Sequence, residues 1–122
     1  MVSYLNSVPL SERILESNRI LAKFPHSIPV IIESKNEEIM KKLKKNKFLV
    51  PYDVSASYLL IAVRKHLQLD SSKAIFMYCG DNIICGTEMI HELYSDYKKK
   101  IWDKNTDKFF YVYISIENTF GC

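Results

Sequence analysis

The stretch that decides the fold spans residues 47–79 and reads KFLVPYDVSASYLLIAVRKHLQLDSSKAIFMYC. Its first five residues, 47–51, predict a short strand that Pro51 closes. A helix is predicted over residues 55–68, because one face recurs at i, i+3, i+4, i+7 and i+8, formed by Leu59, Ala62, Val63, His66 and Leu67. Residues 74–79 form a further apolar strand. The stretch therefore predicts one long helix that packs across a small sheet.

Further elements are predicted on both sides of this stretch. A helix is expected over residues 11–23, with Ser11 as its N-cap and Pro25 just beyond its end. Residues 33–46 are polar and lysine-rich, which indicates a surface connection with a helical turn. The remaining expected elements are a short turn at 3–7, a strand at 28–32, a turn at 80–82, a short returning strand at 83–85, a helix around 89–97, a polar loop at 101–108 and a strand at 109–114 that is buried on both faces.

The order of these elements is helix, then β, β, α, β, short β, α, β. This order matches the α+β ubiquitin-like β-grasp, to which the opening helix is an addition. We expect an N-terminal helical extension at residues 1–24, a β-grasp core at 25–116 and a flexible C-terminal tail at 117–122.

Composition limits the class of protein. The chain has 122 residues, of which 48% are hydrophobic and 25% charged, as is typical of one globular domain. No apolar run approaches the roughly 20 residues that a membrane-spanning helix needs, and residues 1–10 do not form a signal peptide. Three cysteines without a secretory segment indicate a reducing compartment. The net charge of +3 is too weak by itself to indicate a nucleic-acid partner.

The C-terminal residues 117–122, ENTFGC, carry the most informative motif. Ubiquitin-like modifiers end in a short extended tail with glycine at or near its terminus. An activating enzyme threads this tail through a narrow groove, and glycine has no side chain to block the reaction at its carboxyl carbon. Gly121 is masked by Cys122, so activation requires removal of that residue. On the tail alone, a frayed terminus with an incidental glycine remains the alternative.

Several strings together resemble one family, the autophagy ubiquitin-like modifiers, which includes GABARAP, the light chain three proteins and autophagy-related protein eight. The strings are KFP at 23–25, IPVIIE at 28–33, KFLVP at 47–51, VRK at 63–65, KAIF at 73–76 and ENTFG at 117–121. Each string alone is weak, but their order and spacing make a specific signal. The resemblance covers nearly the whole chain.

The resemblance implies a conjugation pathway that acts on Phe120, Gly121 and Cys122. A cysteine protease would cut after Gly121, and an activating enzyme and a conjugating enzyme would then pass the Gly121 carboxylate to phosphatidylethanolamine. The protein would be the substrate throughout, and not an enzyme, with no cofactor of its own. It is expected to be a cytoplasmic monomer that the lipid anchors to the autophagosome membrane.

The resemblance also implies a peptide-docking surface along residues 47–51. In the family, a peptide with an aromatic and an aliphatic anchor adds a strand beside this one. The implied aromatic pocket is lined by Glu16, Ile20, Pro29, Lys47, Leu49 and Phe109. The implied aliphatic pocket is lined by Phe48, Val50, Pro51, Val54, Leu59 and Ala62. Lys45 and Lys47 would pair with acidic residues that flank the anchors, and Arg64 completes the peptide-binding set.

Independent physics supports part of this surface. A short strand between a lysine-rich stretch and Pro51 is a plausible free edge, and edge lysines normally discourage pairing. An acidic peptide would instead be attracted to these lysines, because its carboxylates carry the opposite charge. The alternatives are that Phe48, Leu49 and Val50 are simply core residues and that the lysines form a solvated face. Departures from the family pattern at Ser27, Ala62 and His66 bear on peptide preference.

Other kinds of site have weaker support. The spacing of Cys79, Cys85 and His91 matches no common zinc pattern, so no metal is expected. The lysines at 41–47 lack interleaved aromatic residues, so no nucleic acid is expected, and an anionic lipid surface is favoured over RNA. Two competing functions stay open: a non-conjugated adaptor that only binds peptides, and a modifier of proteins rather than of lipid.

Overall fold

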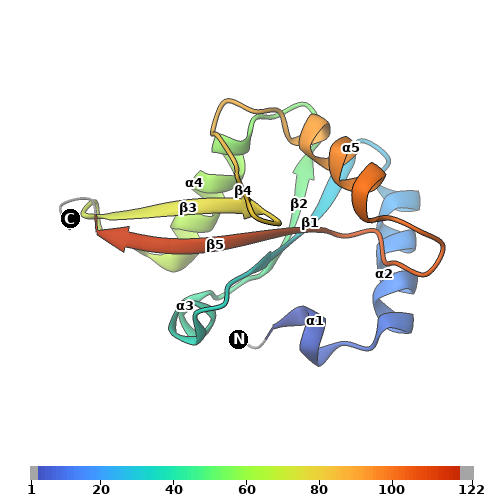
Figure 1. The fold of residues 1–122 in the computed structure, drawn as a ribbon, viewed down its shortest axis with the longest axis horizontal. Coiled ribbons are helices and arrows are strands. Elements are labelled where there is room, and N and C mark those ends of the chain that lie inside the picture. The colour runs from blue at the N-terminus through green and yellow to red at the C-terminus, as the bar shows by residue number, and fades with distance from the viewer. Residues whose placement is uncertain (1–2, 119–122) are drawn as a thin grey trace.

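The structure is a computed structural model that describes residues 3–118. Its centre is a five-stranded sheet in the order β2-β1-β5-β3-β4 (Figure 1). The strands are β1 Ser27–Glu33, β2 Lys47–Pro51, β3 Lys73–Cys79, β4 Asn82–Ile83 and β5 Phe110–Asn118. The helices are α1 Tyr4–Ser7, α2 Leu10–Lys23, α3 Glu37–Lys42, α4 Ala56–Leu67 and α5 Ile90–Ile101.

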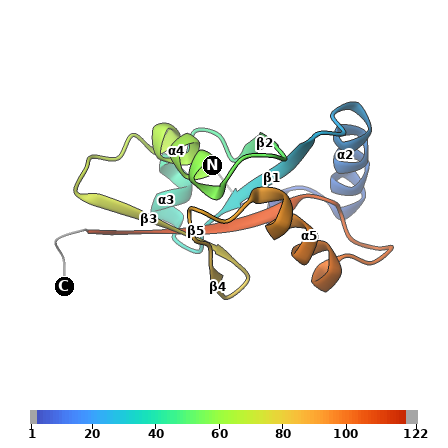
Figure 2. The same cartoon turned by 90° about the horizontal axis from the view of Figure 1, so that it is seen from above.

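Parallel pairing of β1 with β5 places the first and last long strands at the centre of the sheet. β2 flanks β1 in antiparallel pairing, and β3 flanks β5 in the same way. The α4 helix connects β2 to β3, as the deciding stretch predicts. Helices α2 and α5 lie at the opposite end of the molecule from the C-terminal end of β5 (Figures 1 and 2). The predicted α+β architecture with an N-terminal helical part is confirmed.

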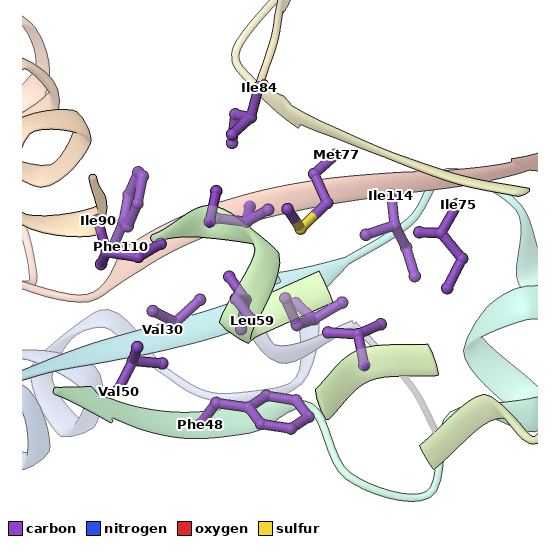
Figure 3. Close-up of a cluster of buried hydrophobic side chains, with 14 of the residues drawn as sticks. Val30, Phe48, Val50, Leu59, Ile75, Met77, Ile84, Ile90, Phe110 and Ile114 are labelled. Carbon is purple, nitrogen blue, oxygen red and sulfur yellow. The ribbon is translucent and has the colours of Figure 1, made fainter. Parts of the chain in front are cut away.

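Two clusters of buried side chains lie against the sheet. In the main cluster, Leu59 of α4 is fully buried among residues of β1, β2 and β5 (Figure 3). The second cluster contains Tyr4, Ile31, Phe109 and Tyr111. Alternate residues of β5 point into different clusters: Phe110 and Val112 lie in the main cluster, and Tyr111 between them lies in the second. This two-sided burial explains why the segment around β5 is continuously apolar rather than alternating.

One local prediction is wrong and a second is only partly right. Ser11 does not cap α2, because the helix begins one residue earlier, at Leu10, and Pro9 occupies the N-cap position without a side-chain hydrogen bond. The connection at 33–46 contains the expected helical turn, which is α3, but part of it is buried rather than on the surface. Asn36 caps α3 by accepting hydrogen bonds from the amides of Glu38 and Ile39, and Ile39, Met40 and Leu43 are buried in the main cluster.

Pro29 lies within a central strand without breaking a ladder. It is opposite Leu49 of β2, and the pairing of β1 with β5 starts only at Val30. The missing amide hydrogen of Pro29 is therefore not needed by β5. At the other end of the sheet, β5 continues to Asn118, so residues 117 and 118 of the expected tail are paired with Ala74 and Lys73.

Candidate peptide-docking edge

The outer edge of β2 presents free backbone groups. Ile32 donates to the carbonyl of Asn46 (2.8 Å), and Tyr52 donates to the carbonyl of His26 (3.1 Å). In an antiparallel pair, hydrogen-bonded positions alternate along each strand. Lys47, Leu49 and Pro51 therefore direct their backbone groups away from β1. Among the described strands none lies beyond β2, so the amides of Lys47 and Leu49 face outward without a strand partner.

The structure brings the predicted aromatic-pocket residues together beside this edge. Lys47 Nζ donates to Glu16 Oε1 of α2 (2.7 Å). Ile20, from the next turn of α2, packs against the cluster that contains buried Phe109. Pro29 and Leu49 are cross-strand partners. Leu49 is 43% exposed, so the structure places this side chain outside the core.

The Glu16 carboxylate is held in its charged form by its neighbours. Burial opposes ionisation, but hydrogen bonds from Lys47 and from Tyr4 outweigh it and lower the pKa of Glu16. The Lys47 side chain remains 44% exposed although its ammonium group is bonded to Glu16. Lys45 Nζ lies 5.1 Å from the centre of the Phe48 ring. The edge of β2 therefore carries two cationic groups.

The predicted aliphatic-pocket residues are also close together, but most of them are covered. Phe48, Val50 and Leu59 are buried in the main cluster. The partly exposed members are Pro51, Val54 and Ala62. Arg64, at the C-terminal end of α4, donates hydrogen bonds to the carbonyls of Asp70 and Lys73. Its guanidinium group thus fastens α4 to the start of β3.

Comparison with known proteins gives the family. A sequence model described as "Autophagy protein Atg8 ubiquitin like" matches residues 12–121. Autophagy-related protein 8h of Arabidopsis thaliana is 35% identical over 119 residues, which cover 98% of this chain and 95% of that protein. The chain belongs to the Atg8 family. The crystal structure of Trypanosoma brucei ATG8 matches with a TM-score of 0.79 and 30% identity, covering 99% of both chains.

A second solved structure has the same fold at lower identity. It is Plasmodium falciparum Atg8 in complex with a Plasmodium falciparum Atg3 peptide, with a TM-score of 0.75 and 24% identity. The aligned region covers 94% of this chain and 96% of the Plasmodium falciparum chain. The suspected family and the ubiquitin-like fold are therefore confirmed. The protein is a ubiquitin-like autophagy protein of the Atg8 family.

Other sequence-based expectations meet the structure in different ways. The conjugation residues Phe120, Gly121 and Cys122 lie outside the described residues. Within residues 3–118, no helix is long and apolar enough to cross a membrane. The described part of this Atg8-family chain holds no group of three or more His, Cys, Asp or Glu side chains that could bind a metal ion.

Sequence reasoning missed four residues that shape the site: Tyr4, Arg13, Glu33 and Asp107. Glu33 is 2% exposed, and its carboxylate accepts hydrogen bonds from the amides of Tyr4 (2.8 Å) and Leu5 (3.3 Å). Asp107 accepts from Arg13 Nε (2.9 Å) and from the Tyr111 hydroxyl (2.7 Å). Glu33 is 28 and 29 positions from its two partners, and Asp107 is 94 positions from Arg13, so no local pattern could have identified these contacts.

Proposed function

We propose that this chain is a lipid-conjugated modifier of autophagy that docks receptor peptides along β2. A cysteine protease cleaves after Gly121 and releases Cys122. An activating enzyme adenylates the Gly121 carboxylate with ATP and releases pyrophosphate, and a thiol of that enzyme then displaces AMP to form a thioester. The thioester passes to a thiol of a conjugating enzyme, and the amine of phosphatidylethanolamine displaces that thiol to form an amide. The lipid then anchors the domain to the autophagosome membrane.

The free edge of β2 is the single observation that carries the docking half of the proposal. Two outward amides and the neighbouring carbonyls can form a ladder with an extended peptide. Each such hydrogen bond contributes a net stabilisation of about 1 kcal/mol. Lys45 and Lys47 favour a peptide that carries acidic residues, and exposed Leu49 offers it an apolar contact.

Family membership supports the conjugation half of the proposal. The family model matches this chain as far as Gly121, the residue after which cleavage is proposed. The complex of Plasmodium falciparum Atg8 with an Atg3 peptide supports a conjugating enzyme of the Atg3 type as a partner of this chain as well. The protein supplies no catalytic group to these steps, since the chemistry occurs at its own terminus.

A proline substitution tests the docking edge at the level of the backbone. Leu49→Pro removes an amide hydrogen that faces outward and leaves the ladder to β1 intact. Leu49→Ala is the matched control, because it shortens the side chain and keeps the amide. The ligand is an acidic peptide with aromatic and aliphatic anchors, and its affinity is measured by fluorescence polarisation. We expect Leu49→Pro to lower this affinity at least tenfold more than Leu49→Ala does. Equal affinity of the two folded variants would contradict docking by strand addition.

Intact-mass measurement tests conjugation. The protein is recovered from the soluble and the membrane fractions of its own cells. We expect a soluble form that lacks Cys122 and a membrane form heavier by one phosphatidylethanolamine, and we expect Gly121→Ala to abolish the heavier form. A full-length mass in both fractions would instead support the non-conjugated adaptor. Protein-sized adducts would support a modifier of proteins.

A further inference from the structure

Tyr4 of α1 reaches the same pocket that the docking surface needs for an aromatic anchor. Its ring meets the ring of Phe109 edge to face, with centroids 5.4 Å apart and an interplanar angle of 77°. Lys47 Nζ lies 4.6 Å from the centre of the Tyr4 ring. The Tyr4 hydroxyl donates to Glu16 Oε2 at 2.6 Å. Three residues of the expected aromatic pocket thus contact one side chain of the chain itself.

The fit of Tyr4 is that of an occupant rather than of a surface residue. Tyr4 is 4% exposed and belongs to the buried cluster of Ile31, Phe109 and Tyr111, against which Ile20 also packs. Its contacts are those by which a peptide's aromatic residue would be recognised: an aromatic floor, a cation over the ring and an acceptor for a polar tip.

Contacts to other elements hold α1 in this position. A helix of four residues does not form by itself, so its place depends on tertiary contacts. The Glu33 carboxylate accepts from the first two amides of α1, those of Tyr4 and Leu5. Arg13 Nη1 donates to the carbonyls of Leu5 (3.3 Å) and Val8 (2.6 Å). These bonds fasten both ends of the α1 segment and can be released without breaking the sheet.

We propose that Tyr4 is a built-in competitor that occupies the aromatic half of the peptide-docking edge and that an incoming aromatic side chain must displace. This inference rests on the proposed docking function of β2. Tyr4 belongs to a different cluster from the buried residues of the aliphatic pocket, in which Pro51, Val54 and Ala62 are partly exposed. The outward amides of β2 keep no partner among the described strands while Tyr4 is in place. The apparent affinity for a peptide with an aromatic anchor is therefore proportional to the fraction of molecules in which Tyr4 has left the pocket. A peptide that lacks the aromatic anchor is not affected by Tyr4.

Two peptides and two variants test the competitor. The peptides are an acidic peptide with aromatic and aliphatic anchors and the same peptide with alanine at the aromatic position. Tyr4→Ala empties the pocket, while the control Tyr58→Ala removes a tyrosine that is 51% exposed on α4. We expect Tyr4→Ala to bind the aromatic peptide at least fivefold more tightly than the wild type does. We expect no change for the alanine peptide, and none with Tyr58→Ala.

The outcomes separate this inference from the proposed docking function. One outcome is that the wild type binds the aromatic peptide and Leu49→Pro lowers the affinity, whereas Tyr4→Ala leaves the affinity unchanged or lowers it. This outcome refutes the role of Tyr4 as a competitor and leaves the docking edge supported. If the wild type and Tyr4→Ala both fail to bind, the docking function itself is refuted.

A measurement on the wild type keeps the test independent of the folding of Tyr4→Ala. Amide hydrogen exchange at Tyr4 and Leu5 reports whether α1 stays docked to Glu33. We expect saturating aromatic peptide to accelerate exchange at both amides at least tenfold, and the alanine peptide to leave it unchanged. Unchanged exchange with the aromatic peptide bound would overturn the inference.

Discussion

Asp107 offers the sharpest test of how the N-terminal helices are attached to the sheet. Its carboxylate accepts three hydrogen bonds, from Arg13 Nε (2.9 Å), the Tyr111 hydroxyl (2.7 Å) and the Phe109 amide (3.0 Å). The side chains of Arg13 and Asp107 are only 13% and 5% exposed. Asp107→Ala therefore leaves a nearly buried guanidinium group without its counter-charge.

The magnitude follows from the burial of this pair. Removing one partner of a buried ion pair costs about 3–5 kcal/mol. Arg13 keeps its bonds to the carbonyls of Leu5 and Val8, which places the loss near the lower end of that range. We expect Asp107→Ala to lower the free energy of unfolding by about 3 kcal/mol and the Tm by about 10 °C. This loss is a large share of the about 5–15 kcal/mol that stabilises a typical domain.

Urea denaturation followed by circular dichroism measures this loss, and a double-mutant cycle with Arg13→Ala isolates the interaction of the pair. Glu38→Ala is the matched control, because it breaks the pair with Lys41 (3.5 Å) in which the two side chains are 67% and 74% exposed. We expect that control to change stability by less than about 0.5 kcal/mol. A cost for Asp107→Ala no larger than the control's, or a coupling energy near zero, would refute the reasoning.

Three further predictions follow from other contacts. Glu33→Ala removes the acceptor at the N-terminus of α1, and we expect faster hydrogen exchange at the amides of Tyr4 and Leu5, by a factor that corresponds to about 1 kcal/mol; unchanged exchange would contradict this cap. Gly80 has a φ of +60°, so Gly80→Ala should lower stability by about 1 kcal/mol in thermal denaturation although nothing lies within 4 Å of the added Cβ; a neutral result would exclude backbone strain at this turn. The pKa of Glu16 is lowered from its usual 4.5, so the stability that its charge contributes is present above pH 4.5 and is lost as the pH falls through the folded-state pKa. The stability difference between the wild type and Glu16→Gln should therefore shrink from pH 7 to pH 3, and a constant difference would show that the charge of Glu16 does not contribute.

Much of the fold could be predicted because its signals are local. Residues 47–51 were expected as a strand and form β2 with the same bounds. The helical spacing that includes Leu59 and Val63 identified the face of α4 that is buried. Boundaries and caps were less accurate, as at Ser11, because α2 begins after Pro9, which offers no side-chain acceptor and so leaves no capping signal in the sequence. The candidate edge at β2 was also expected, since a short strand flanked by lysines has few other places in a sheet.

The sequence by itself determined the order of the elements, the family resemblance and the position of β2, the candidate docking edge, because periodicity and motifs act over a few neighbouring residues. Only the tertiary structure decided what lies in the aromatic pocket. Tyr4 meets Glu16 twelve positions away, and Arg13 meets Asp107 across 94 positions. Such polar contacts form where packing excludes water, so that each group must find its partners within the protein, and that depends on how the N-terminal helices lie against the finished sheet.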